Sequence, residues 1–255
     1  MADMSVLGTA PVAAWCPSLD TAGNGTTTLT DLSGNGYNGT LTNMDAATDW
    51  PADTGAGGVR ALDFDGSNDY VTCGDISTIK GIAGLSISLW VKTDRVNAFK
   101  YAIGKATTAN NRLGVYLNSG AVGFTLETGS TVYGQTDLQV NNNDWSHAIF
   151  VFDGAETGNA LRCKIYIDSV LATISFTGSV GSLTPSTTDP FLIGARTISS
   201  NNISARIDDV RIFNIVLTAD QRSYLYASGL GRGVQPTGNP TGILQNNLQS
   251  MRLGL

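Results

Sequence analysis

The 255-residue sequence has few of the residues on which most enzyme chemistry depends. It contains one histidine, His147, and only two glutamates, Glu127 and Glu156, among 21 acidic residues. Neither glutamate has the carboxylate partner that a retaining glycosidase places about 5 Å away. A nucleophilic triad needs a histidine base oriented by an acid, whereas His147, close to Trp145, is typical of a packed strand. The sequence therefore predicts a protein that is not an enzyme.

Cysteine, long apolar runs and positive charge are also scarce. Cys16, Cys73 and Cys163 form no CxxC pair, so we expect three buried thiols, with at most one disulfide as the alternative. No stretch approaches the ~20 apolar residues of a membrane span, and the first residues lack a basic, apolar leader. Charged residues make up 14 % of the chain, with a net charge of −6. This balance argues against binding to nucleic acid or to anionic lipid.

Glycine and strand-like alternation are abundant. Glycine accounts for 30 of the 255 residues, well above the usual share of roughly 7 %. Apolar residues alternate in 85–92, which predicts a strand with one buried face. Residues 112–118 and 121–127 predict a hairpin that turns at Ser119-Gly120. Residues 161–168 and 170–176 predict a second hairpin, which turns at Asp168-Ser169.

The strands predict a fold with two layers. Residues 148–152 are apolar on both faces, which is typical of a central strand covered by a second layer. We count about twelve to fourteen strands, and an open sheet of that size usually splits or curls. The predicted fold class is therefore all-β, a two-sheet antiparallel jelly-roll sandwich.

A short helix and an extended tail follow the strands. Thr218 and Gln221 have the spacing of a capping box, and we expect the helix to be pinned by Leu217 and Leu225 and to end at Gly229. Five glycines and two prolines in 228–242 predict a linker. The apolar residues beyond it form a segment too short for a stable helix alone, which needs a partner surface. They are the predicted docking residues Ile243, Leu244, Leu248, Met251, Leu253 and Leu255.

Oxygen-bearing side chains recur in the loop 31–41. Its Asp-x-Ser-x-Asn-Gly spacing matches the first half of an EF-hand loop, but Thr42 stands where the bidentate glutamate is needed. Any other ligands must therefore come from elsewhere in the chain.

The alternation of apolar residues shifts by one position at the acidic pair Asp208-Asp209. Apolar residues fall on odd numbers before Asp208-Asp209 and on even numbers after it, which predicts a β-bulge. Our hypothesis is one structural Ca²⁺ at the sandwich rim, held by Asp31, Asn35 and Asp208 or Asp209, with carbonyl oxygens. The alternative is that Asp31 caps a turn and that the aspartate pair is solvated.

The order of the motifs resembles the laminin G-like, concanavalin A-like jelly-roll family. The resemblance extends over residues 12–229, with an N-terminal arm, 1–11, before it and the linker and docking tail, 230–255, after it. It implies two antiparallel sheets, often a calcium near one rim, and binding of glycans or proteins without catalysis. The matching segments are 31–41, 61–71, 85–92, 145–154, 164–168 and 193–219.

Two functions remain open. Trp90 lies on the polar side of its strand and is the candidate platform for stacking a sugar, unless a second layer covers it. The tail favours a non-catalytic subunit of a larger assembly, such as a phage capsid decoration or tail protein, that docks on neighbouring subunits and also binds surface glycans. We expect it on a virion or another extracellular assembly, made without a signal peptide. The alternative is a free calcium-dependent lectin.

Overall fold

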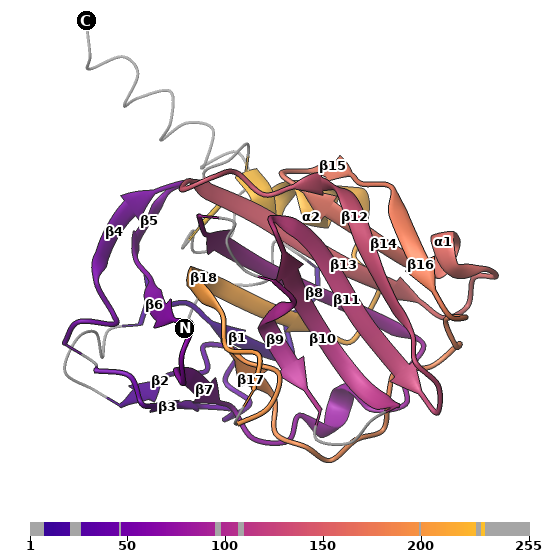
Figure 1. Cartoon of the computed structure of the whole chain (residues 1–255), viewed down its shortest axis with the longest axis horizontal. Coiled ribbons are helices and arrows are strands. Elements are labelled where there is room, and N and C mark those ends of the chain that lie inside the picture. The colour runs from indigo at the N-terminus through magenta and orange to yellow at the C-terminus, as the bar shows by residue number, and fades with distance from the viewer. Residues whose placement is uncertain are drawn as a thin grey trace, which may run out of the picture.

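The protein is a two-layer β-sandwich. The computed structural model describes residues 8–20, 27–45, 47–94, 98–106, 110–198, 200–227 and 231–232. Within them, two large antiparallel sheets pack face to face, and a separate hairpin lies at one end (Figure 1). This arrangement confirms the predicted fold class.

The first sheet has seven strands in the order β1-β18-β8-β13-β14-β15, with β6 also paired to β18. They are β1 (Ala13–Trp15), β6 (Leu62–Asp65), β8 (Gly84–Lys92), β13 (Trp145–Asp153), β14 (Cys163–Ile167), β15 (Val170–Leu171) and β18 (Ser204–Phe213).

The second sheet has nine strands in the order β16-β12-β11-β10-β9-β17-β7-β3-β2. They are β2 (Thr28–Leu29), β3 (Gly39–Thr42), β7 (Tyr70–Thr72), β9 (Lys100–Lys105), β10 (Asn111–Asn118), β11 (Ala121–Thr128), β12 (Tyr133–Gln139), β16 (Ile174–Thr177) and β17 (Leu192–Ile193). The separate hairpin is β4 (Ala52–Gly55) and β5 (Gly58–Arg60). The described part of the chain thus has more strands than we predicted, because several are only two to four residues long and too short to show alternation.

The core lies between the sheets and is built by the predicted alternation. Every second residue of β8 from Leu85 is buried against the opposite sheet, and Phe150 of β13 stacks on Phe124 of β11 at 4.9 Å between ring centroids. The other face of β13 packs under helix α2 (Ala219–Tyr226). The predicted central strand is therefore covered on both faces, by a sheet on one side and by a helix on the other. Cys16, Cys73 and Cys163 are buried free thiols, as expected.

One predicted hairpin is confirmed and the other is wrong in its second half. β10 and β11 turn at Ser119 and Gly120, which have φ values of 52° and 88°. The second hairpin turns at Asp168-Ser169 as expected, but its returning strand ends after two residues. The chain then crosses to the other sheet, where β16 pairs with β12. The one-turn helix α1 (Asn159–Arg162) occupies the predicted start of this hairpin.

The capping box of α2 is confirmed. The Thr218 hydroxyl accepts a hydrogen bond from the Gln221 backbone N–H at 3.3 Å, and the Gln221 side chain accepts one from the Thr218 N–H at 2.8 Å. The helix ends at Tyr226 and is capped by Ala227, which is left-handed at φ 44°, so it ends before the expected Gly229. Leu217, just before the helix, and Leu225, within it, are buried against β13, as predicted. No helix in the described residues is both long and apolar enough to cross a membrane.

Candidate functional site

A row of three charged side chains and one tryptophan crosses the outer face of the first sheet. Arg206 of β18 lies directly opposite Asp63 of β6 on one side and Lys92 of β8 on the other, and Lys92 lies opposite Trp145 of β13. Residues directly opposed on antiparallel strands share a face of the sheet. These four side chains therefore stand side by side, on the face that points away from the core.

Asp53 of β4 joins the members of this row. Its carboxylate accepts hydrogen bonds from Arg206 Nη1 at 2.7 Å, from Trp145 Nε1 at 3.0 Å and from Lys92 Nζ at 3.5 Å. Burial raises the pKa of Asp53, but the hydrogen bonds from Arg206 and Trp145 and the nearby positive charges outweigh burial, so the pKa lies below its ordinary value. Arg206 also donates to Asp63 at 2.9 Å. The guanidinium is therefore held between two carboxylates.

A polar pocket opens beside the row. It has a volume of about 340 Å³. Thr93 is buried, and its hydroxyl donates to the Ser204 carbonyl at 3.2 Å, whereas Asp94 and Asn143 are exposed. The lining residues are Asp63, Lys92, Thr93, Asp94, Asn143, Ser204, Ala205 and Arg206. All but Ala205 have polar side chains, so the pocket offers both donors and acceptors to a ligand that has many hydroxyl groups.

Arg232 supports the hairpin beside the pocket, although the sequence placed it in the linker. Its side chain is fully buried, and its Cζ lies 3.9 Å from the centroid of the Trp145 ring. The guanidinium donates to the carbonyls of Asp53, Gly55 and Arg60. Residues 231–232 therefore belong to the folded domain. No pattern in the glycine-rich residues 228–242 predicts that Arg232 is buried.

The Arg232 side chain leaves no room for a side chain at position 58 of the hairpin. A Cβ at Gly58 would lie 2.5 Å from Arg232 Cζ. Arg232 Nη1 also lies 3.1 Å from Asp208 Oδ2, and neither side chain is exposed. The segment after α2 is thus attached both to the hairpin and to β18.

Two of the predicted calcium ligands, Asp31 and Asn35, are engaged in local hydrogen bonds. The Asp31 carboxylate accepts hydrogen bonds from the N–H groups of Ala14, Ser33 and Tyr37 and from the Ser33 hydroxyl. This is the turn-capping role that we gave as the alternative. Asn35 donates its side-chain amide to the Val12 carbonyl at 3.0 Å. In the described ranges, no group of three or more His, Cys, Asp or Glu side chains is arranged to hold a metal ion.

The predicted bulge is present, but its two carboxylates are buried. The register between β18 and β8 shifts between Asp208 and Arg211, and Asp209 has φ 49°. Asp209 accepts from Arg211 at 2.6 and 2.8 Å, while Asp208 accepts from Ser18 and Arg232. Both aspartates are buried, so the solvated pair that we gave as the alternative is wrong. Both carboxylates therefore have partners within the protein, and calcium binding remains a prediction.

The buried carboxylates predict a pH-dependent stability. Burial, and then the charge of Asp209, raise the pKa of Asp208 to about 6, and burial raises the pKa of Asp69 to about 6. Between pH 4 and 6 the folded state keeps protons that the unfolded chain has released. The free energy of unfolding should therefore fall as pH rises through this range, by at most about 1.4 kcal/mol per pH unit for each carboxyl.

Urea unfolding at a series of pH values measures this slope. Asp208→Asn should make it shallower, because the variant removes one of the two protons. A stability that rises between pH 4 and 6, or a slope that is the same in the variant, would contradict the prediction.

Trp90 is not an open platform for a sugar. Its side chain is 1 % exposed, and its ring stacks on His147 and on Tyr226 of α2, at 4.9 and 6.1 Å between ring centroids. The prediction of a stacking surface at Trp90 is therefore wrong, because the helix covers this part of the sheet. The alternative, a second layer over Trp90, is confirmed.

His147 and Glu127 are buried in strands, and Glu156 lies in an exposed turn. His147 lies buried in β13, as predicted, and burial and the Arg211 charge lower its pKa to about 3. Its Nε2 lies 2.8 Å from the Ser88 hydroxyl, but both side chains are inaccessible. Glu127 is buried on β11, 3.5 Å from Arg112 Nε, and Glu156 lies exposed in the turn after β13.

The predicted docking segment lies outside the described residues. Its members, Ile243, Leu244, Leu248, Met251, Leu253 and Leu255, follow residue 232, where the description ends. Docking on neighbouring subunits therefore remains a prediction.

Solved structures with this fold include domains whose sugar complexes are known. Domain 4 of AbnA, a GH43 extracellular arabinanase from Geobacillus stearothermophilus in complex with arabinotriose, superposes with a TM-score of 0.62 at 19 % identity, over 84 % of this chain and 97 % of that domain. The botulinum neurotoxin serotype D ligand-binding domain in complex with N-acetylneuraminic acid gives a TM-score of 0.59 at 14 % identity, over 88 % of this chain. The match covers 52 % of the toxin domain, so this chain spans about half of its length.

Sequence comparisons address the family directly. A search of curated proteins finds no match. The family model of the concanavalin A-like lectin/glucanases superfamily matches residues 65–221, which include β7 to β18 and the start of α2. Because this match covers more than half of the chain and the fold agrees with it, the chain belongs to the concanavalin A-like lectin/glucanase superfamily.

Proposed function

We propose that the protein is a non-catalytic adhesive module that binds a neutral glycan in the polar pocket beside Arg206. The observation on which the proposal rests is the prearranged set of donors and acceptors around Arg206. The complexes of an arabinanase domain with arabinotriose and of a toxin domain with N-acetylneuraminic acid support it, because both proteins have a similar fold.

The ion pairs make the pocket suitable for hydroxyl groups. Arg206 and Lys92 are already paired with Asp53 and Asp63, so their positions are held before a ligand arrives. Side chains ordered in advance lose less entropy on binding. The pocket lining balances Asp63 and Asp94 against Lys92 and Arg206, so it has no excess positive charge to attract a sugar that has a carboxylate. We therefore assign a neutral sugar to this pocket.

The role in a larger assembly is a second, finer proposal. It rests on the apolar residues of the segment 243–255 and on no contact in the described part of the chain. The glycan proposal does not depend on it.

Two residues at the pocket rim allow a test of the glycan proposal. Asp94→Ala and Asn143→Ala each remove polar groups from exposed positions, so the fold should be retained. We expect each variant to bind about tenfold more weakly, the equivalent of one hydrogen bond. A glycan array identifies the sugar, and isothermal titration calorimetry measures the affinities.

The matched control is Glu156→Ala, an exposed acidic residue that does not line the pocket. It should bind as the wild type does. Wild-type protein that retains no neutral glycan, or rim variants with unchanged affinity, would overturn the proposal.

A further inference from the structure

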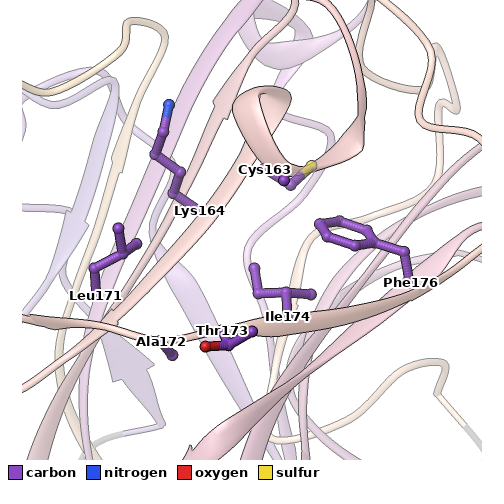
Figure 2. Close-up of a pocket in the computed structure, with 8 residues that line it drawn as sticks. Cys163, Lys164, Leu171, Ala172, Thr173, Ile174 and Phe176 are labelled. Atoms are coloured by element: carbon purple, nitrogen blue, oxygen red, sulfur yellow. The ribbon is translucent and has the colours of Figure 1, made fainter.

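An apolar pocket lies where the last strands of the two sheets meet. It has a volume of about 300 Å³ and is lined by Cys163 and Lys164 of β14, Leu171 of β15, and Ile174 and Phe176 of β16, among others. Figure 2 shows Cys163 and Phe176 on one side of the hollow, Lys164 and Leu171 on the other, and Ile174 below. Leu171 is 55 % exposed, and its neighbour Val170 is 56 % exposed. This edge of the sandwich is therefore both hollow and apolar.

β16 has a free edge next to this pocket. In the described residues it is the last strand of its sheet and pairs only with β12. The Asp137 N–H donates to the Thr173 carbonyl, so residues 173 and 137 form a hydrogen-bonded pair. Bonded and non-bonded pairs alternate along antiparallel strands. The backbone groups of Ser175 and Thr177 therefore face β12, whereas those of Ile174 and Phe176 face the free edge.

Nothing in β16 protects this edge against another strand. Its sequence, Ile-Ser-Phe-Thr, contains no charge and no proline, the usual means of blocking an edge. An extended segment fits such a site, since its backbone pairs with the edge and its alternate side chains enter the pocket. A helix already satisfies its own N–H and C=O groups. It would leave those of Ile174 and Phe176 unpaired.

We propose that residues 251–255 of the same chain add to β16 as a strand and place an apolar side chain in the pocket. Met251, Leu253 and Leu255 alternate with Arg252 and Gly254, so one face of the added strand is apolar. This occupant differs from the neighbouring subunit that the sequence suggested for the same residues.

The anchored start of the tail makes an intramolecular contact feasible. Arg232 is held over Trp145 at the start of β13, and β14 is the next strand toward the pocket. Neighbouring strands lie about 4.8 Å apart and rise about 3.3 Å per residue. Cys163 of the pocket lies opposite Phe152, further along β13 than Trp145, so the span is roughly 25 Å. The residues between 232 and 251 reach as far as roughly 60 Å when extended. A tethered segment also has an effective concentration in the millimolar range.

Hydrogen exchange of the β16 amides tests this proposal on the full chain. The amides of Ile174 and Phe176 should exchange at least about tenfold more slowly in the full chain than in a chain that ends at residue 242. The amides of Ser175 and Thr177 should be the same in both, because they face β12. The alternating pattern distinguishes strand addition from a general change in stability.

A substitution in the apolar pocket provides a second, independent test. Leu171→Asp should reproduce the effect of the truncation, while Ile198→Asp, the same change at a residue that is 61 % exposed elsewhere, should not. Equal exchange of Ile174 and Phe176 with and without residues 243–255 would overturn the proposal. Protection that is lost on dilution would also overturn it, since it would assign the site to the tail of a second copy. If Leu171→Asp does not fold, the comparison between the full chain and the chain that ends at residue 242 still tests the proposal.

Discussion

The Asp53→Asn variant should lose about 3–5 kcal/mol of its free energy of unfolding, the usual cost of removing one partner from a buried ion pair. The Asp53 side chain is 4 % exposed and lies within 4 Å of charged nitrogens of Lys92, Arg206 and Arg232. An asparagine keeps the shape but leaves these cations without their shared negative charge. Urea unfolding followed by tryptophan fluorescence measures the loss.

Asp63→Asn is the matched control for this prediction. Asp63 pairs with the same guanidinium as Asp53, but its side chain is 38 % exposed. Exposed ion pairs contribute about 0–1 kcal/mol, so this variant should remain nearly as stable as the wild type. Similar losses of unfolding free energy in the two variants would contradict the prediction, because they would show that burial does not set the contribution of Asp53.

The Arg232→Met variant should also lose about 3–5 kcal/mol. Methionine keeps an apolar stem over Trp145 but removes the cation beside Asp208, whose side chain is fully buried. It also leaves the carbonyls of Gly55 and Arg60 without this donor. The same urea experiment applies. A loss below 1 kcal/mol would contradict the assignment of residue 232 to the folded domain.

A second substitution connects this loss to the hairpin. Gly58→Ala should destabilise the wild type, because its Cβ would overlap the guanidinium. In the Arg232→Met background the same change should cost less, since the shorter side chain leaves space. A double-mutant cycle measures this coupling, and additive losses would exclude the contact.

The ion network and the proposed glycan pocket share their residues. Arg206 and Lys92 line the pocket and are positioned by Asp53, which in turn contacts Arg232. Variants of these residues would change stability and binding together. The rim residues Asp94 and Asn143 are therefore the appropriate choice for the binding test.

Features that depend on neighbouring residues were predictable. The alternation in β8, the Ser119-Gly120 turn and the capping box of α2 each involve residues a few positions apart, and the structure confirms them. The prediction of a bulge at Asp208-Asp209 was also correct, because the shift in the alternation of apolar residues is visible within one strand. The burial of its carboxylates was not predictable, since that depends on what covers the strand.

The break between β15 and β16 shows where local patterns fail. Residues 170–176 have the composition of one strand, but Ala172 and Thr173 carry the chain from one sheet to the other. The crossing depends on β12 offering an edge to Ile174. No pattern within the segment reports the position of that distant strand.

The sequence by itself determined the all-β class and the scarcity of catalytic side chains, because these depend on composition and on short-range periodicity. The family followed from the order of motifs that resembles it, and the family model agrees. Only the tertiary structure decided that Tyr226 covers Trp90, that Arg232 is buried, and that Asp53 joins Arg206 across 153 residues of chain. Burial and ion pairing are set by the register between distant segments. Hydrophobic alternation specifies which face of a strand points inward, but not which charged residue will stand opposite another.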